Sequence, residues 1–188
     1  MNMKKIGLDL IFLVFLCISC DFFIPGNAPP PKKTWTEQLS DELPLLGHRN
    51  WILVVDKAFP AQTAAGIKVI NTGESLQDVL QVTLQKIDRS LHVKSIVYTD
   101  KELEFLTPQL VPSVEKYKKD LQKTLRGIEP QTLLHDSVFV RIDRASKLFK
   151  VLVLKTEETI PYSSVFLQLD CKYWSSENEQ ALRALMKK

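Results

Sequence analysis

The sequence predicts an α/β fold in which a mainly parallel β-sheet lies between two layers of helices, giving an α/β/α arrangement. Short apolar runs alternate along the chain with longer amphipathic segments. Several of the runs are apolar throughout, which is typical of strands buried on both faces of a parallel sheet. The chain has 188 residues, of which 45% are hydrophobic and 25% charged, a globular composition at about the length of one domain.

The first predicted element is a short helix over residues 36–43, which Pro44 ends because proline lacks the N–H that a helix interior needs. Trp51-Ile52-Leu53-Val54-Val55 follows as an unbroken apolar strand, and Asp56 stands directly after it. Residues 67–70 form the second predicted strand. In open parallel sheets, ligands gather beyond the carboxyl ends of the strands, so Asp56 is a candidate site residue.

The middle of the chain contributes two longer helices and one strand. Ser75 and Asp78 resemble a capping box and begin an amphipathic helix. The third predicted strand covers residues 92–98. Pro112 lies in the first turn of the next helix, which Gly127 ends.

The last third of the chain completes the predicted sheet. Alternating apolar residues predict a strand over residues 138–142, and a short helix follows over residues 144–149. Two further apolar runs, over residues 151–154 and 165–169, predict two more strands. A capped closing helix covers residues 176–187.

The first twenty residues have the pattern of a bacterial lipoprotein export signal. Lys4 and Lys5 precede an apolar run over residues 10–18, which is too short to span a bilayer, since a spanning helix needs about 20 apolar residues. Ser19-Cys20 then resembles a lipobox, in which the chain is cut before the cysteine and the cysteine thiol is lipidated. The alternative is a buried N-terminal element with incidental cysteines.

This signal predicts the domain organisation. Residues 1–19 are the signal peptide, residues 20–34 are the lipidated cysteine with a proline-rich tether, and residues 35–188 are the α/β domain with its C-terminal helix. We therefore expect an exported protein that a lipid anchors to a bacterial membrane, facing the periplasm or the cell surface. Cys171, the cysteine that remains in the domain, is expected to be a small buried residue of a strand.

Composition and motifs argue against several function classes. A formal net charge of +3, with basic residues spread along the chain, argues against nucleic-acid binding. The sequence has no GxGxxG or GxxxxGK[ST] phosphate loop, no GxSxG nucleophile elbow and no HExxH motif. Of the three histidines, His92 and His135 are predicted to be ordinary surface or edge residues. His48 differs, because it follows Gly47 just before a buried strand.

Several short motifs occur in a characteristic order. They are Gly47-His48, Asp56 with Pro60, Arg141-Ile142-Asp143-Arg144, and Tyr162-Ser163-Ser164 before the last predicted strand. Their order and spacing resemble the family of ribose pyranases and fucose mutarotases, called RbsD/FucU, over about residues 36–170.

The resemblance implies a three-layer α/β/α fold, ring-shaped homo-oligomers with sugar sites between neighbouring subunits, and interconversion of sugar anomers or ring forms without a metal or cofactor. It implies catalytic roles for His48, Asp56 and Tyr162, with a monosaccharide such as ribose or fucose as the ligand. An imidazole that titrates near neutrality can exchange protons with the ring oxygen and the anomeric hydroxyl of a sugar. A carboxylate accepts hydrogen bonds from sugar hydroxyls, and a phenol can donate one.

Four further residues are assigned to sugar binding, namely Asn50, Lys57, Arg144 and Ser164. Asn50 and Ser164 stand where family members carry Asp and Asn, and Lys57 replaces a small residue beside Asp56. Three functions therefore stay open. The protein is an active mutarotase, a sugar-binding surface lipoprotein without catalysis, or a structural lipoprotein that uses the fold alone.

Overall fold

The structure is a computed structural model that describes residues 31–187. The predicted signal peptide, the lipidation residue Cys20 and most of the predicted tether lie outside the described residues. The chain divides into two units, Met1–Lys32 and Lys33–Lys188, and every described helix and strand belongs to the second unit. None of the helices among residues 31–187 combines the length and the apolar character that crossing a bilayer requires.

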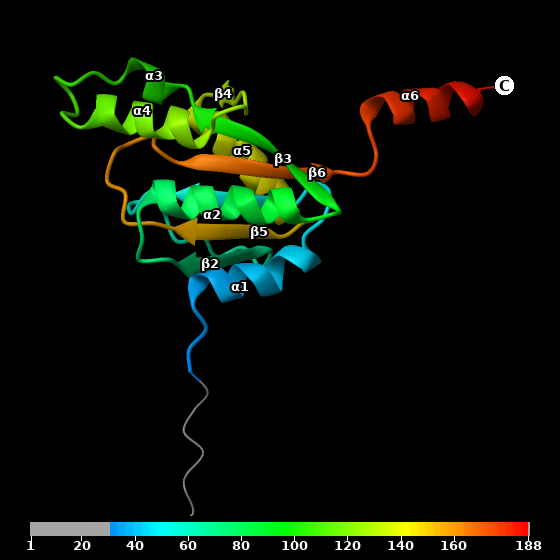
Figure 1. Ribbon diagram of the computed structural model, residues 1–188, viewed down its shortest axis with the longest axis horizontal. Helices are drawn as coiled ribbons and strands as arrows, with labels where there is room; N and C mark the ends of the chain where they lie inside the picture. Colours follow the sequence, from blue (N-terminus) through cyan, green and yellow to red (C-terminus); the bar gives the residue numbers. More distant parts are fainter. Residues whose placement is uncertain (1–30, 188) are drawn as a thin grey trace, which may run out of the picture. The chain divides into compact units, whose positions relative to one another are not determined.

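The described strands form one six-stranded sheet with the order β2-β5-β1-β6-β3-β4 (Figure 1). The strands are β1 (Trp51–Val55), β2 (Ile67–Asn71), β3 (Val93–Asp100), β4 (Gln131–Leu133), β5 (Val151–Lys155) and β6 (Val165–Cys171). β6 is antiparallel to both of its neighbours, β1 and β3, and the other three strand pairs are parallel. Of the six strands, five therefore share one direction, which confirms the predicted mainly parallel α/β fold.

Helices cover both faces of this sheet. They are α1 (Trp35–Glu42), a short 3₁₀ helix η1 (Leu43–Leu45), α2 (Leu76–Arg89), α3 (Glu102–Phe105), α4 (Val114–Thr124), α5 (His135–Ser146) and α6 (Ser176–Leu185). Because side chains alternate along a strand, Ile52 and Val54 of β1 pack with α1, α2 and α4 on one face. Leu53 and Val55 pack with α5 on the other face.

β1 is the buried centre of the fold. All five of its residues are buried, because β5 and β6 flank its two edges and helices cover both faces. This position explains why residues 51–55 form an unbroken apolar run instead of an alternating one.

The predicted starts of α1, α2 and α6 are close to the observed ones, whereas Pro112 lies just before α4 and the helix predicted over residues 144–149 overlaps the end of α5. Thr34 caps α1, since its hydroxyl accepts a hydrogen bond from the Glu37 amide at 3.3 Å and the Glu37 carboxylate accepts one from the Thr34 amide at 2.7 Å. Ser75 caps α2 by accepting from the Asp78 amide at 3.2 Å. Gly127 lies beyond the end of α4 with a φ of +82°, a conformation that favours glycine.

One predicted strand is wrong. Residues 138–142 alternate in polarity, but they belong to α5, which also contains Arg144. Val138, Ile142 and Ala145 recur at helical spacing and are buried against the sheet, whereas Val140 is exposed. The short elements β4 and α3 were not predicted, because three or four residues carry too little periodicity to be recognised.

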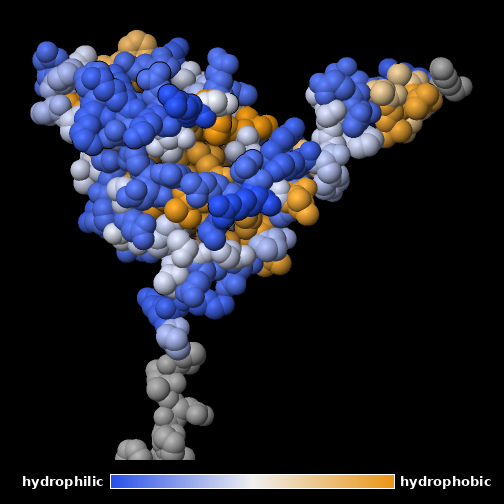
Figure 2. All heavy atoms as spheres, viewed as in Figure 1, coloured by the Kyte–Doolittle hydropathy of each residue, from blue (hydrophilic) through white to orange (hydrophobic). Residues whose placement is uncertain are grey.

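The C-terminal helix, α6, begins after the N-cap Ser175, as predicted for this region, and buries none of its residues. Apolar side chains gather on it (Figure 2), and Leu182, Leu185 and Met186 are exposed. Cys171, expected to be buried, is the last residue of β6 and is only partly buried.

The burial of β1 can be tested by truncating one of its side chains. Leu53→Ala should lower the free energy of unfolding by about 2–5 kcal/mol, because it leaves a cavity at a fully buried position. Leu185→Ala, on the exposed face of α6, serves as the control and should change it by less than about 0.5 kcal/mol. Urea denaturation of both variants measures the difference, and equal losses would contradict the central position of β1.

Candidate functional site

The carboxyl ends of β1, β3 and β4 and the start of β6 lie at the same end of the strands, which we call the carboxyl edge of the sheet. Asp56 follows β1, Asp100 is the last residue of β3, and His135 comes two residues after β4. β6 runs in the opposite direction, so residues 162–164, which precede it, lie at the same edge. Polar side chains from distant parts of the sequence therefore gather at the carboxyl edge, where α/β proteins commonly bind ligands.

Asp56 and Ser164, both predicted site residues, are joined by two hydrogen bonds. The Ser164 hydroxyl donates to Oδ2 of Asp56 at 2.9 Å, and the Asp56 amide donates to the Ser164 hydroxyl oxygen at 3.2 Å. Oδ1 of Asp56 accepts from the Ala58 amide at 2.8 Å. These three bonds hold the carboxylate in one orientation at the end of β1.

Tyr162, the third predicted catalytic residue, contacts a histidine. Its ring lies perpendicular to the imidazole of His135, with ring centroids 5.3 Å apart and an interplanar angle of 90°. Its φ of +57° lies in the left-handed region, which costs a non-glycine residue about 1 kcal/mol. Strained backbone of this kind is common at ligand sites, although it does not identify one alone.

His135 is bound to a buried carboxylate. Nδ1 of His135 lies 3.0 Å from Oδ2 of Asp100, whose side chain is 0% exposed. Burial raises the pKa of Asp100 to about 6, although the hydrogen bond and the charge of His135 act to lower it. Oδ1 of Asp100 is buried and has no hydrogen-bond partner among residues 31–187.

Glu102 holds the backbone of the same histidine. Each of its two carboxylate oxygens lies 3.1 Å from the His135 amide nitrogen, which is one of the free N–H groups at the start of α5. Phe139, one turn further along α5, packs against the imidazole with ring centroids 4.8 Å apart. His135 is thus restrained through both its backbone and its ring.

His48, the predicted catalytic histidine, lies at the opposite edge of the sheet. It precedes β1, whereas Asp56 follows it, and five strand residues at about 3.3 Å each separate them by roughly 17 Å. Within one chain, the structure therefore brings Asp56 and Tyr162 to the same edge and leaves His48 at the other.

At that opposite edge, His48 forms an imidazole–carboxylate pair of its own. Arg49 Nε donates to Nε2 of His48 at 3.1 Å, so Nδ1 carries the proton and donates to Oδ1 of Asp170 at 2.9 Å. Burial acts to raise the pKa of Asp170, but the hydrogen bonds from the Cys171 amide and His48 and the charge of Lys94 bring this pKa below its ordinary value. The His48 side chain is 55% exposed, so its ring is oriented and accessible.

Of the four residues assigned to sugar binding, three divide between the two edges. Asn50 is at the His48 edge, where its side chain accepts from the Gly47 amide at 2.7 Å and donates to the Lys150 carbonyl at 3.2 Å. Lys57 is at the Asp56 edge with Ser164 and pairs with Glu157. Arg144 is exposed in the last turn of α5.

His135, predicted to be an ordinary surface or edge residue, is partly exposed but does not lie in a loop. It begins α5, and its ring contacts Tyr162 and pairs with Asp100. One sequence signal pointed to this group, because Asp100 follows an apolar strand just as Asp56 does. The same rule that selected Asp56 therefore selects Asp100.

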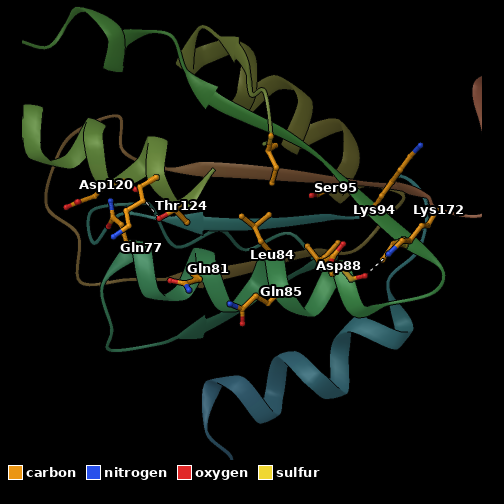
Figure 3. A pocket seen from close by; sticks show the side chains of 14 residues that line it. Gln77, Gln81, Leu84, Gln85, Asp88, Lys94, Ser95, Asp120, Thr124 and Lys172 are labelled. Carbon is orange, nitrogen blue, oxygen red and sulfur yellow. Dashed lines mark hydrogen bonds between the residues drawn. The ribbon is translucent and has the colours of Figure 1, made fainter. Parts of the chain in front are cut away.

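The structure also contains two hollows, and the second of them is lined in part by Thr99 and Leu103, which are the sequence neighbours of Asp100 and Glu102. The one in Figure 3 has a volume of about 680 Å³ and is formed by α2, α4 and β3, with Gln77, Gln81 and Gln85 of α2 along one side. The second, of about 830 Å³, lies around α4 and the loop that follows it. Neither hollow is lined by Asp56 or His135. Among residues 31–187, no group of three or more His, Cys, Asp and Glu side chains is arranged to hold a metal ion.

The solved structures that are similar to this chain include two in complex with a sugar. One is RbsD from Bacillus subtilis in complex with D-ribose, at 19% identity and a TM-score of 0.52, covering 74% of this chain and 96% of that one. The other is the fucose mutarotase from Streptococcus pneumoniae in complex with L-fucose, at 16% identity and a TM-score of 0.50, covering 79% of this chain and 97% of that one. At these identities the similarity shows a shared fold.

A family model gives the stronger assignment. No curated protein matches the chain. The model of the RbsD / FucU transport protein family, however, matches residues 32–171, which contain β1 to β6 and both edges of the sheet. The chain belongs to the RbsD / FucU transport protein family.

Proposed function

We propose that this protein is a monosaccharide mutarotase or pyranase, which interconverts the anomers or ring forms of a free sugar at the carboxyl edge of its sheet. The observation that carries the proposal is the convergence of Asp56, His135 and Tyr162 at that edge. Membership of the RbsD / FucU family supports it, and two structural relatives were solved with D-ribose and L-fucose.

The side chains suit the chemistry of sugar ring opening. The reaction needs a proton delivered to the ring oxygen and another removed from the anomeric hydroxyl, which an imidazole can do near neutral pH. The oriented Asp56 carboxylate can accept hydrogen bonds from sugar hydroxyls, and the Tyr162 phenol can donate one. General acid–base catalysis of this kind accelerates a reaction by about 10²–10⁴-fold.

In the proposed site, His48 comes from a second copy of the chain. Its ring is exposed and already oriented by Asp170 and Arg49, but it lies at the edge opposite Asp56. In a ring-shaped homo-oligomer with head-to-tail contacts, the His48 edge of one copy meets the carboxyl edge of the next. Each site then contains His48 from one copy and Asp56, His135 and Tyr162 from its neighbour.

The catalytic proposal can be tested by NMR saturation exchange, which measures the rate at which sugar anomers interconvert. The protein should accelerate exchange of ribose, fucose or a related monosaccharide, and His48→Ala and His135→Ala should each lower the added rate by about 10²-fold or more. Gln81→Ala, in the hollow of Figure 3, is the control and should leave the rate unchanged.

Calorimetry on the same sugars separates the alternatives. Binding without accelerated exchange would support the non-catalytic sugar-binding protein in place of the enzyme. Neither binding nor exchange with any monosaccharide would support the structural lipoprotein.

The shared site makes a second prediction. When His48→Ala and His135→Ala chains are denatured, mixed one to one and refolded together, about one quarter of the interfacial sites receive both histidines, so activity should return to about one quarter of the wild-type value. Each variant refolded alone remains inactive. If both histidines acted within one chain, the mixture would stay inactive too.

We also propose that the protein is an exported lipoprotein with its lipid on Cys20. Two lysines, an apolar run over residues 10–18 and Ser19-Cys20 support this. Labelling of expressing bacterial cells with a fatty acid should mark the wild type and the control Cys171→Ser in the membrane fraction, whereas Cys20→Ser should carry no label. Labelling that survives Cys20→Ser would reject Cys20 as the lipidated residue.

A further inference from the structure

We infer that Asp100 is a positioning residue, which fixes the tautomer of His135 and leaves its Nε2 as the ring nitrogen that exchanges protons with a ligand. The catalytic part of this inference rests on the proposed function. The tautomer itself is a property of the protein alone, so it can be measured without any sugar.

The hydrogen bond between the two side chains determines the tautomer. An ionised carboxylate only accepts hydrogen bonds, so Nδ1 of His135, 3.0 Å from Oδ2 of Asp100, must carry a proton. A neutral imidazole has one N–H and one lone pair, and the lone pair is therefore on Nε2. The Asp100 side chain is 0% exposed, which keeps water from competing for Nδ1, while the His135 side chain is 33% exposed.

Contacts with three other residues restrain His135 in this orientation, one of them from its own helix and two from other parts of the chain. Glu102 of α3 accepts from the His135 amide, and the rings of Phe139 and Tyr162 meet the imidazole at interplanar angles of 66° and 90°. A flip of the ring would leave the buried carboxylate of Asp100 without its donor, which is costly inside a protein. The ring therefore has one favourable orientation.

The charged groups around this pair come from several elements. Asp100 stands on β3, Glu102 on α3, Asp56 after β1 and Tyr162 before β6. The two neighbouring carboxylates disfavour the charge on Asp100, and the imidazole favours it. Burial is the largest of these influences, so the pKa of Asp100 is raised to about 6.

The test uses the full chain labelled with ¹⁵N-histidine. At pH 7.5 the ¹⁵N shifts of wild-type His135 should show the proton on Nδ1. Asp100→Asn should populate the other tautomer, because an amide side chain can donate a hydrogen bond to Nδ1 as well as accept one from it. Asp136→Asn removes the neighbouring exposed carboxylate in the first turn of α5 and should leave the tautomer unchanged. A proton on Nε2 in the wild type overturns the inference even if Asp100→Asn does not fold.

A stability measurement tests separately whether the Asp100 carboxylate titrates near pH 6. The pKa of Asp100 is raised from 3.8 to about 6, so the folded protein binds this proton more tightly than the unfolded chain. Its contribution to stability is therefore present at low pH and is lost as the pH rises through about 6. The urea midpoint of the wild type should fall relative to that of Asp100→Asn between pH 4 and pH 7. Parallel curves would show that Asp100 does not titrate in this range.

Sugar exchange then tests the catalytic part. If the wild type is active, Asp100→Asn should lower kcat by about 10–100-fold, with little change in KM, and should move the pH profile, as expected when the partner of a reacting group is removed. An unchanged profile overturns the positioning role. If the wild type accelerates no sugar, the proposed function fails, while the tautomer measurement still decides what Asp100 does to His135.

Discussion

The burial of β1 is the constraint on which the rest of the structure depends: helices cover both of its faces, and a neighbouring strand pairs with it on each side. The backbone N–H and C=O groups of β1 bond to β5 and β6, and its side chains, which alternate between the two faces, pack against helices. A strand enclosed in this way accommodates apolar residues, so polar residues stand at its ends. The same five residues therefore hold His48 and Asp56 at opposite edges of the sheet.

The direction of β6 completes the carboxyl edge. If β6 were parallel to β1, residues 162–164, which precede it, would lie at the opposite edge with His48. Because it is antiparallel, Tyr162 and Ser164 lie beside the ends of β1 and β3. Because this one strand is reversed, the Tyr162 phenol and the Ser164 hydroxyl lie near Asp56, Asp100 and the His135 imidazole.

Each edge of the sheet has one imidazole–carboxylate pair, and the two pairs differ in burial. His135 is bound to a carboxylate that water does not reach, whereas His48 and its partner Asp170 are both partly exposed. The low dielectric around the first pair strengthens its hydrogen bond. The exposure of the second pair leaves its imidazole accessible to another molecule, as the proposed site between two copies requires.

The sequence by itself determined the α/β class, the central strand and the Ser75 cap of α2, because apolar runs and capping residues act over a few neighbouring positions. It also selected Asp56 and Tyr162 as candidate site residues, and the structure places both at the carboxyl edge. Only the tertiary structure decided that residues 138–142 are helical, since burial of one side against the sheet selects the helical period. It likewise decided the pairing of His135 with Asp100, which stand 35 positions apart. Such a contact depends on strand order and direction, and neither is encoded in local periodicity.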